Sequence, residues 1–409
     1  MSQYFDSLLS PALCAYRKNR SCEDVLLRCL EDWKNALDMN LYIGCISMDL
    51  SKAFDSLPHN LLLAKLSAYG MSINSVQLIK SYLTDRQQCV KIGNYYSEWK
   101  IVKRGVPQGS LTGPLLFNIF MNDFVQKMKQ LCSVYNYADD NNLCVIHENP
   151  MIMKSILENC SIEAITWFKE NHMQANPDKF QSMILQRQTK SCDLQFCVDN
   201  VVIPISETIK ILGVNIDKDL SFQKHVSDLC KKAARQVNIL GRLSNQLNYT
   251  CRLKILNSFV ISNFNYCSLV YHNSSFRNRR KLEKVHERAL RVVLNDFTAP
   301  YCELLENVGS QSLYEKRCKK TMLYVFKTIN DLCPLFPSDF FEVKQTTYDM
   351  RQSIILKLPK FNTVRYGQNS LKYQGCKYWN ATPNEITCSK EVNDFKCALD
   401  KCTFKYETL

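Results

Sequence analysis

The sequence contains no apolar run that approaches the ~18 residues of a membrane-spanning helix, which argues against an integral membrane protein. Its first residues, MSQYFDSLLS, lack both the basic start and the apolar stretch of a secretory signal, and they do not have a transit-peptide composition. Internal repeats, low-complexity tracts and long Gly/Ser linkers are also missing. The length of 409 residues suggests two or three domains, and a hydrophobic content of 46% allows a sizeable core. From the missing targeting and membrane segments we expect an intracellular protein of the cytoplasm or the nucleus.

No two of the 20 cysteines form a CxxC pair. The closest pairs, Cys192 with Cys197 and Cys397 with Cys402, have four residues between them, and neither has a second pair at zinc-site spacing. Without a secretory signal, we expect reduced and mostly buried thiols that act as small apolar residues, rather than disulfides or a structural metal site.

The net charge of +13 is concentrated in one segment. Residues 218–291 contain 15 Lys and Arg against 4 Asp and Glu, a local excess of +11 (15 − 4). Such a patch suits a polyanion, either nucleic acid or an acidic membrane surface.

Two segments of this region have helical periodicity and carry their basic residues on one face. In the first, an apolar stripe falls within about 80° at the helical period: Val226, Cys230, Ala233, Val237 and Leu240. The basic residues of the first segment lie nearly opposite this stripe: Lys224, Lys231, Arg235 and Arg242. Those of the second segment share one face: Arg277, Lys281, Lys284, Arg288 and Arg291. The alternative is an ordinary solvated face, but acids are almost absent from both faces. We therefore favour contact with nucleic acid.

Local patterns predict the order of the elements. Helices are expected over residues 21–38, 61–68, 73–83, 114–129 and 155–171, and mostly helical structure follows from residue 222 to residue 330. We expect strands in YIGCISMDL, which reaches Asp49, and in IKILGVNID as a single strand. Hairpins are predicted in QQCVKIGNYYSEWKIVKRG and in CSVYNYADDNNLCVIH, the latter with its turn at Asp139–Asn142.

Three aspartates carry the chemistry of the prediction. Asp49 ends an apolar strand, and Asp139 and Asp140 follow at a predicted turn. Carboxylates that repel one another at strand ends are stabilised by a cation, and two divalent ions can clamp the reacting oxygens of a phosphoryl transfer. The alternative is that Asp139 and Asp140 only form a turn and Asp49 only caps a helix.

Longer motifs decide between these alternatives. The blocks DLSKAFDSLPH (49–59), GVPQGSLTGPLLFNIFMND (105–123) and YADD (137–140) resemble reverse-transcriptase motifs A, B and C in order and spacing. NPDKF (176–180) is similar to motif D, and IKILGVNID (209–217) is similar to the primer grip. AYRKNRS near the start and RYGQNSLKYQGCKYWNATPNEI near the end also resemble segments of LINE-type, jockey-like retrotransposons, which lack long terminal repeats.

The resemblance implies an α+β right-hand polymerase fold with fingers, an antiparallel-sheet palm and a helical thumb. It places fingers and palm in residues 1–217, a basic helical thumb and connection in 218–330, and an element-specific region in 331–409. The implied function is RNA-directed DNA polymerase, with an RNA template, a DNA primer and dNTPs as partners and no membrane. The alternatives are a decayed or co-opted copy that only binds nucleic acid, and a group II intron maturase, whose characteristic tail the sequence lacks.

The resemblance also implies roles for individual residues. Asp49 and Asp139 would hold two Mg²⁺ ions, or Mn²⁺ in their place, with Asp140 beside them. Phe54 occupies the steric-gate position that excludes a ribose 2′-OH, although an apolar core aromatic is the simpler alternative.

Nucleotide contacts follow from the same resemblance. Gly105, Pro107, Gln108 and Gly109 match the loop that touches the template and the incoming nucleotide. Lys179 would neutralise the leaving pyrophosphate, or it is only an exposed lysine at a helix end.

The sequence departs from the family pattern in several places. Thr112 replaces the usual leucine before Gly113, at a position that we expect to be buried, and Asn141 replaces Thr or Ser. No endonuclease domain precedes the motifs and no zinc knuckle follows them.

The motifs also begin close to the first residue. Met1 lies 48 residues before Asp49, so we expect an N-terminally truncated and impaired polymerase. Arg17, Lys18 and Arg20 form the basic cluster left on this side, for the triphosphate or for the template.

Overall fold

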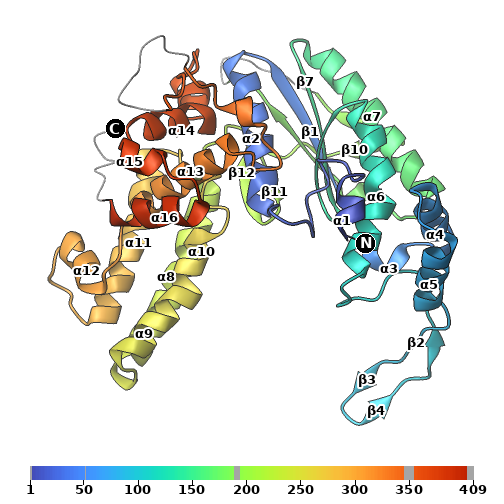
Figure 1. The fold of residues 1–409 in the computed structure, drawn as a ribbon, viewed down its shortest axis with the longest axis horizontal. Helices are drawn as coiled ribbons and strands as arrows, with labels where there is room; N and C mark the ends of the chain where they lie inside the picture. The colour runs from blue at the N-terminus through green and yellow to red at the C-terminus, as the bar shows by residue number, and fades with distance from the viewer. Residues whose placement is uncertain (1, 51, 188–193, 345–353, 403–409) are drawn as a thin grey trace. The chain divides into compact units, whose positions relative to one another are not determined.

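The computed structural model describes residues 2–50, 52–187, 194–344 and 354–402, and it is a mixed helix and sheet protein (Figure 1). The chain forms two compact units. Unit 1 comprises Met1–Ser21, Leu41–Leu185 and Thr189–Glu207, and unit 2 comprises Cys22–Asn40, Gln186–Gln188 and Thr208–Leu409. No helix in these described ranges is both long and apolar enough to cross a membrane.

These units divide the chain differently from the domains expected at 1–217, 218–330 and 331–409. The segment Cys22–Asn40 belongs to unit 2, although it lies between two parts of unit 1 in the sequence. The long C-terminal part of unit 2 begins at Thr208. Residues on both sides of position 331 share unit 2. The functional division into fingers, palm, thumb and C-terminal region stays a prediction.

Unit 1 is built on a four-stranded antiparallel sheet with the strand order β6-β7-β1-β8. Its strands are β1 (Tyr42–Met48), β6 (Ser133–Tyr137), β7 (Asp140–His147) and β8 (Gln181–Leu185). β1 is almost entirely buried, as its run of apolar residues predicts. At Gly44 a side chain would collide with the Met153 Sδ, 2.2 Å from the Cβ position, so this glycine allows close packing of α7 on β1.

The α-helices in the described part of unit 1 are α1 (Ser2–Asp6), α3 (Ala53–Ser56), α4 (His59–Ala68), α5 (Ile73–Leu83), α6 (Gly113–Lys129) and α7 (Pro150–Glu170). The predicted helices near 61–68, 73–83 and 114–129 are confirmed. The prediction of 155 as the start of α7 is wrong, because the helix begins at Pro150. The Asn149 side chain caps it by accepting hydrogen bonds from the Met151 and Ile152 backbone N–H groups.

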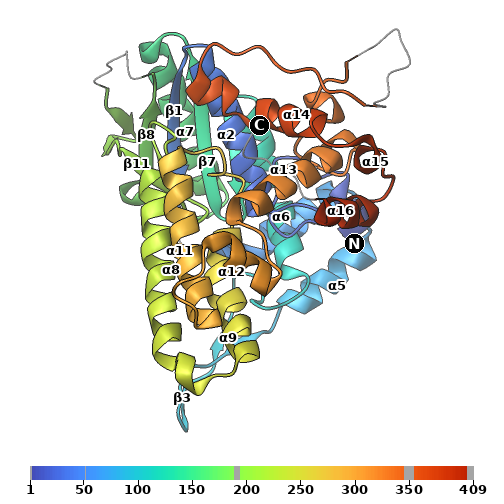
Figure 2. The ribbon, with the colours of Figure 1, turned by 90° about the vertical axis from the view of Figure 1, so that its left-hand side faces the viewer.

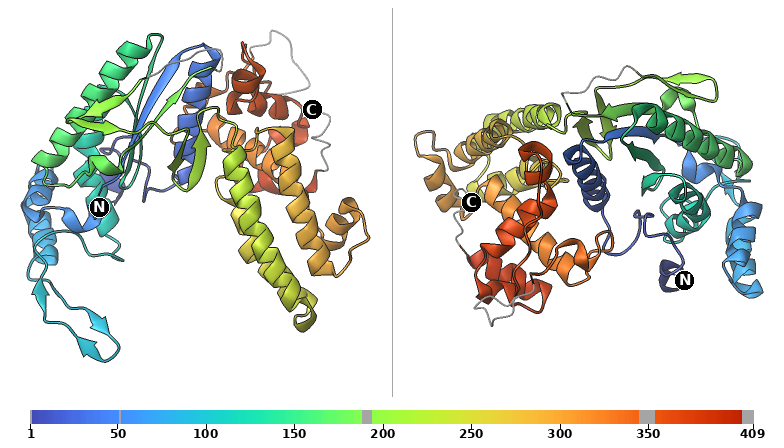
Figure 3. Two further views of the ribbon diagram at one scale, coloured as in Figure 1. Left: turned by 180° about the vertical axis from the view of Figure 1, so that it is seen from behind. Right: turned by 90° about the horizontal axis from the view of Figure 1, so that it is seen from above.

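Small two-stranded sheets accompany the main sheet of unit 1. The predicted hairpin before Gly105 is confirmed as two paired segments in tandem: β2 (Gln87–Gln88) with β5 (Lys100–Ile101), and β3 (Lys91–Ile92) with β4 (Tyr95–Tyr96). A further pair is formed by β9 (Phe196–Val198) and β10 (Val201–Ile203). Figure 3 shows the β2–β5 hairpin extending away from the helices of unit 1.

The segment IKILGVNID in unit 2 is a hairpin, not the single strand that was predicted. β11 (Thr208–Ile211) pairs with β12 (Val214–Asp217) through a turn at Leu212 and Gly213. Both turn residues have positive φ, 46° and 81°, as in the tight turns that match the twist of paired strands. A leucine in this conformation is uncommon, which is why the apolar run concealed the turn.

The rest of unit 2 is helical, as predicted for residues 222–330. Its helices are α2 (Cys22–Asp38), α8 (Gln223–Leu243), α9 (Tyr249–Ile255), α10 (Ser262–Asn265), α11 (Phe276–Leu294), α12 (Tyr301–Val308), α13 (Leu313–Ile329), α14 (Leu371–Asn380), α15 (Asn384–Thr387) and α16 (Val392–Lys401). A π-helical stretch, Leu256–Ile261, joins α9 to α10. α8 and α11 run side by side (Figure 2).

The C-terminal helices share one core with α13. Buried Met322 and Phe326 of α13 pack with Trp379 of α14 and Phe395 of α16. The Phe326 and Phe395 rings stack at 4.4 Å between centroids. The region after residue 331 is therefore built onto the preceding helices rather than around a core of its own.

Helix α2 is anchored to this C-terminal part of unit 2. The buried Glu31 carboxylate accepts hydrogen bonds from the Leu371 and Lys372 N–H groups at 2.6 and 3.1 Å. The Asp38 carboxylate accepts bonds from the Thr363 N–H and hydroxyl at 2.7 and 2.6 Å. Acidic side chains of α2 thus satisfy backbone donors far along the chain, including those at the start of α14.

Candidate active site

The three predicted aspartates lie at one end of two neighbouring strands. β1 is antiparallel to β7, with Met48 opposite Asn141. Asp49 directly follows Met48, and Asp140 directly precedes Asn141, so both leave the strand pair at the same end. Asp139 stands in the two-residue turn before Asp140. The sheet topology therefore gathers all three carboxyl groups at one edge of unit 1.

Electrostatics agree with this placement. Burial, together with the nearby charges of Asp139 and Asp49, raises the pKa of the Asp140 carboxyl above its ordinary value. Both neighbours act on Asp140 because like charges in proximity disfavour ionisation. A cation bound here would relieve this repulsion.

The donor set suits a hard divalent ion that also has other ligands. Within the described ranges, no group of three or more His, Cys, Asp and Glu side chains has the geometry of a metal site. Mg²⁺, however, usually takes only one or two carboxylates and completes its shell with water and substrate phosphates. The chemistry of Asp49, Asp139 and Asp140 fits that mode of binding.

The centre of the turn that carries Asp139 lies earlier in the chain than predicted. Tyr137 pairs with Asp140, so the turn consists of Ala138 and Asp139 rather than Asp139–Asn142. Ala138 takes a left-handed conformation with a φ of 56°, which is uncommon for a residue with a side chain. Asn141 and Asn142 lie inside β7.

Two buried asparagines hold this turn, and sequence reasoning missed the first of them. The Asn136 Nδ2 donates to the Ala138 carbonyl at 3.0 Å and to the Asn141 Oδ1 at 2.8 Å. The Asn141 Nδ2 then donates to the Asp139 carbonyl at 2.9 Å. The signal available in the sequence was an asparagine on each side of the turn, within otherwise apolar strands.

The loop Gly105–Gly109 is attached to the segment that follows Asp49. The Gly105 N–H donates to the Leu57 carbonyl at 2.8 Å, and the Val106 N–H donates to the Phe54 carbonyl at 3.0 Å. The His59 Nε2 lies 2.8 Å from the Gly105 carbonyl oxygen. Two motifs that are separated by fifty residues of sequence therefore form one structure.

Glycine is required at Gly105 for two reasons. Its φ is 83°, and a Cβ atom would lie 2.7 Å from the Asp55 Cα. Gly109 also has a left-handed φ of 79°, but no atom lies within 4 Å of its Cβ position, so its backbone faces open space. The exposed Gln108 donates from its Nε2 to the Asp55 Oδ1 at 2.9 Å.

Thr112 is not buried as expected. It is partly exposed and occupies the N-cap position of α6, where its side chain makes no capping hydrogen bond. The cost of a hydroxyl in place of a leucine side chain is therefore smaller than for a core position.

Phe54 packs against the core of unit 1 and stays partly exposed. Its ring stacks on the buried Phe117 at 4.3 Å between centroids and with a 16° angle between ring planes. The Tyr16 ring makes an edge-to-face contact with the Phe54 ring. The contact with Phe117 is that of a core aromatic, and the steric-gate role of Phe54 stays a prediction.

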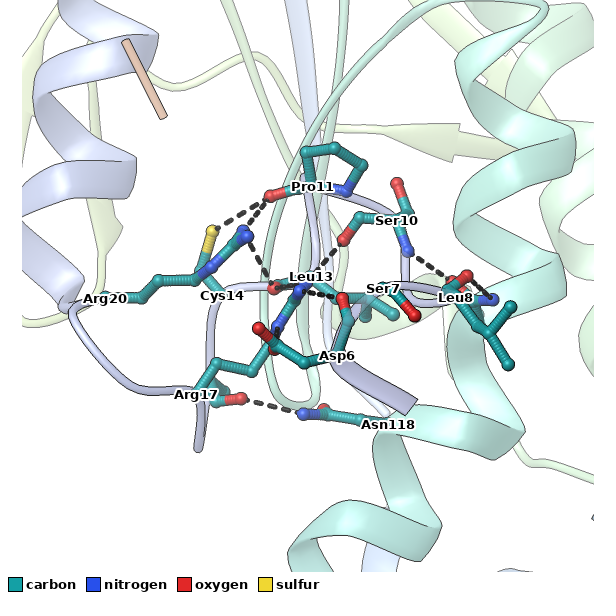
Figure 4. Close-up of polar contacts among 12 residues, drawn as sticks. Asp6, Ser7, Leu8, Ser10, Pro11, Leu13, Cys14, Arg17, Arg20 and Asn118 are labelled. Carbon is teal, nitrogen blue, oxygen red and sulfur yellow. Dashed lines mark hydrogen bonds and ion pairs between the residues drawn. The ribbon is translucent and has the colours of Figure 1, made fainter. Parts of the chain in front are cut away.

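Of the predicted basic cluster near the N-terminus, Arg17 and Arg20 make internal contacts (Figure 4), whereas Lys18 is exposed. The Arg17 guanidinium donates to the Asp6 Oδ1 at 2.7 Å and to the Ser10 carbonyl at 2.8 Å. Its side chain is only 6% exposed, so it is not available to a triphosphate. Arg20 donates to the Pro11 and Leu13 carbonyls.

These arginines shape the loop that ends at Tyr16. Asn118 on α6 fixes the same loop by donating to the Ala15 carbonyl at 2.8 Å. Tyr16 has a positive φ of 59°, and its ring is exposed. Burial and the charge of Asp139 raise the pKa of the Tyr16 hydroxyl.

Lys179 is exposed at the end of a one-turn 3-10 helix, Pro177–Lys179. The preceding segment reaches the site, because Ala175 forms a β-bridge with Leu50, the residue after Asp49. Both alternatives for Lys179 remain open, since its position suits a charge near the site and also an ordinary exposed lysine.

In unit 2, the two basic helices have the predicted faces. Of the predicted apolar stripe of α8, Val226, Ala233, Val237 and Leu240 are buried and Cys230 is only half-buried, and α8 packs on α11. Most of the predicted basic residues are exposed: Lys224, Lys231, Arg235, Arg242, Arg277, Lys284 and Arg288. Lys281 is partly buried between the helices and is the exception. The Arg288 guanidinium donates to the Asn238 Oδ1 at 2.7 Å, which ties the two helices together.

Comparison with known proteins gives a consistent result. The model of a family described as reverse transcriptase (RNA-dependent DNA polymerase) matches residues 1–216. The chain is 24% identical over 299 residues to the probable RNA-directed DNA polymerase from transposon BS of Drosophila melanogaster, covering 68% of this chain and 32% of that protein. It is 24% identical over 292 residues to the RNA-directed DNA polymerase from mobile element jockey of Drosophila funebris, covering 68% and 31%.

The chain spans about a third of the length of these curated relatives. Among solved structures, it is similar to apo telomerase from Candida tropicalis, with 14% identity and a TM-score of 0.43, over 82% of this chain and 54% of that chain.

Proposed function

Since the chain belongs to the reverse transcriptase family, we propose that it is the RNA-directed DNA polymerase of a retrotransposon of the LINE type. The observation that carries this proposal is the gathering of Asp49, Asp139 and Asp140 at one end of β1 and β7. The reaction is the attack of a primer 3′-hydroxyl on a deoxynucleoside triphosphate, with pyrophosphate as the leaving group.

Asp49 and Asp139 are the residues that would hold two divalent ions, Mg²⁺ or Mn²⁺, with Asp140 beside them. When bound, such ions supply charge stabilisation for the attacking and the leaving oxygens. The raised pKa of Asp140 is consistent with this role, because burial and then the charges of Asp139 and Asp49 disfavour its ionised form, and a bound cation would offset both effects. Asn136 and Asn141 position the turn, and they therefore position Asp139.

The incoming nucleotide is proposed to lie against the Gly105–Gly109 loop. The backbone of Gly109 faces open space, which permits close approach of a base or a sugar. Phe54 would fill the volume of a ribose 2′-OH, and Gln108 would contact the template strand or the nucleotide. Lys179 is assigned to the departing pyrophosphate.

The right-hand layout is part of the proposal. We assign the palm to the four-stranded sheet with α6 and α7, and the fingers to the N-terminal loop with the segment between α5 and Gly105. The thumb is assigned to α8 and α11, whose exposed basic faces suit the phosphate backbone of an RNA template paired with a DNA primer.

Primer extension on an RNA template with Mg²⁺ and dNTPs tests the proposed function. The purified chain is expected to extend the primer, and the Asp139→Asn variant is expected to lose at least ~10²-fold in rate, because charge stabilisation by metal ions contributes several kcal/mol. Glu148→Gln is the matched control, since Glu148 is an exposed acid just beyond the opposite end of β7. Extension that is equal in both variants would contradict the assignment of Asp139.

A further inference from the structure

The hairpin between Arg86 and Arg104 stands apart from the core of unit 1 (Figures 1 and 3). It connects the end of α5 to Gly105, so its root is continuous with the site loop. Within it only two-residue strand segments pair, β2 with β5 and β3 with β4. A two-stranded ribbon without a third layer is marginally stable in water.

The ribbon carries large apolar side chains that are exposed to solvent. The exposed fractions are Val90 63%, Ile92 75%, Tyr95 83%, Tyr96 61%, Trp99 65% and Ile101 63%. Successive strand residues point to opposite faces, so Tyr95 and Tyr96 place an aromatic ring on each face. Large exposed apolar side chains gathered on one short element are typical of an interaction site.

The charge of the hairpin indicates what it binds. Residues 86–104 contain five basic residues, Arg86, Lys91, Lys100, Lys103 and Arg104, and one acid, Glu98. The Lys91 ammonium lies 5.1 Å from the centroid of the Tyr96 ring, so a basic and an aromatic group already share one face. Aromatic rings interleaved with basic side chains are the surface that single-stranded nucleic acid requires.

A pocket at the root of the hairpin continues the basic surface. It has a volume of about 590 Å³ and lies among α4, the end of α5 and the end of the hairpin. Lys80, Lys103 and Arg104 line it together with His59, and Asp85 is the acid in its lining. A phosphate backbone that leaves the ribbon therefore meets a concave, basic surface.

We infer that the hairpin 86–104 binds single-stranded nucleic acid. Unpaired bases stack on Tyr95, Tyr96 and Trp99, and phosphates lie against Lys91, Lys100 and the root pocket. Paired bases cannot stack on protein rings, so the surface selects single strands over duplex. This binding needs neither divalent ions nor dNTPs, and it therefore stands or falls separately from the proposed polymerase activity.

Trp99 provides a direct readout in the full chain. Of the four tryptophans, Trp99 is 65% exposed, whereas Trp33, Trp167 and Trp379 are at most 5% exposed. An oligothymidylate of about 20 nucleotides, longer than the ~4–16 that one such platform covers, would be titrated in EDTA at low salt. We expect saturable quenching of tryptophan fluorescence that weakens as salt is raised, because phosphate contacts release counterions. Unchanged fluorescence at saturating oligonucleotide would overturn the proposal.

A triple variant tests the rings. We expect the variant that combines Tyr95→Ala, Tyr96→Ala and Trp99→Ala to bind the oligothymidylate about tenfold or more weakly, as measured by fluorescence anisotropy. The reason is that each base stacked on a ring adds to the free energy of binding. The matched triple variant to phenylalanine keeps a ring at each position and should restore most of the affinity. Equal binding by the alanine and phenylalanine variants would overturn the role of stacking.

Two controls separate this surface from other functions. Thermal unfolding should be unchanged in the alanine variant, because these rings are outside the core. Reversal of Lys231, Arg235 and Arg242 to Glu should affect duplex binding, while oligothymidylate binding should persist. If sedimentation shows that the alanine variant instead abolishes self-association and leaves oligonucleotide binding intact, the hairpin is a protein interface and the proposal is overturned.

Discussion

The rings of Tyr16 and Phe54 meet edge to face, with 5.9 Å between centroids and 87° between planes. Phe54 is thereby held from two sides, by exposed Tyr16 and by buried Phe117. Arg17, the residue after Tyr16, is buried among loop carbonyls, and this keeps Tyr16 in its left-handed conformation. A left-handed conformation is uncommon for a residue with a side chain, and its strain has to be offset by surrounding contacts.

Phe54→Ala should let ribonucleotides be incorporated more readily. Removal of a ring that fills the 2′-OH space should reduce discrimination between dNTPs and rNTPs by ~10–200-fold, as for other small steric differences in a pocket. Tyr16→Ala should give a smaller reduction, because Phe117 still holds Phe54, and Tyr16→Phe should give none. Ratios of kcat/KM for matched nucleotides measure this. Unchanged discrimination in Phe54→Ala would make Phe54 a core residue only.

Asn136→Ala should impair catalysis by loosening the turn that carries Asp139. The Asn136 side chain is fully buried, and its loss leaves the Asn141 Oδ1 and the Ala138 carbonyl without this donor, at a cost of ~1–3 kcal/mol in stability. Asn142→Ala is the matched control, because buried Asn142 donates to the Tyr135 carbonyl and does not contact the turn. Equal extension rates for the two variants, at a temperature where both are folded, would count against this role.

Reversal of Lys231, Arg235 and Arg242 to Glu should weaken binding to every duplex sequence alike. These exposed residues share one face of α8, and contacts to phosphate carry no sequence information. The slope of log affinity against log salt should become shallower by up to ~0.9 for each lost contact. Lys390, Lys396 and Lys401, exposed elsewhere in unit 2, provide a control with the same change in charge. A slope that matches this control would exclude α8 from binding.

Stability should fall as the pH is lowered below the ordinary histidine range. Burial, reinforced by Lys316 and Arg317, lowers the pKa of His286 to about 3 from 6.5. Between these pH values the imidazole of His286 is protonated in the unfolded chain and neutral in the folded chain. The free energy of unfolding is therefore highest above pH 6.5 and decreases as the pH falls toward 3. At a pH of about 5 the loss from His286 is ~2 kcal/mol.

The His286→Asn variant checks this assignment, because asparagine can keep the donor that His286 offers to the Tyr301 hydroxyl at 2.7 Å. Its free energy of unfolding, measured by denaturant titration, should depend less on pH than that of the parent chain between pH values of about 5 and 7. Parallel profiles would show that His286 titrates normally in the folded protein.

Much of the site was readable from the sequence because it depends on local patterns. Asp49 at the end of an apolar run and YADD between two short strands predicted their placement at strand ends. Helices α4, α5 and α6 followed from periodicity. The basic face of α8 followed from the same geometry, because its apolar stripe fixes which side is exposed.

Other features depend on conformations or partners that no local pattern reveals. Ala138 and Leu212 take left-handed conformations that are rare for such residues, so one turn was misplaced and one hairpin was taken for a strand. The sequence predicts a ligand or template contact for Arg17, Lys18 and Arg20, whereas Arg17 and Arg20 donate to backbone carbonyls of the folded loop and Lys18 alone is exposed. Neither the carbonyls nor the buried role of Asn136 can be seen before the chain folds.

The bonds between α2 and the start of α14 also set an order of events in synthesis. The Glu31 carboxylate accepts its hydrogen bond from the Leu371 N–H, so this bond can form only after 340 further residues have been synthesised. Until then α2 exposes Trp33 and an otherwise buried face to the solvent and to the quality-control machinery of the cell. Contacts of such sequence separation slow folding, and nascent chains that expose apolar surface are prone to aggregate. Recombinant production should therefore benefit from slow translation or from added chaperones, and a fragment that stops before Leu371 should be recovered mainly in the insoluble fraction.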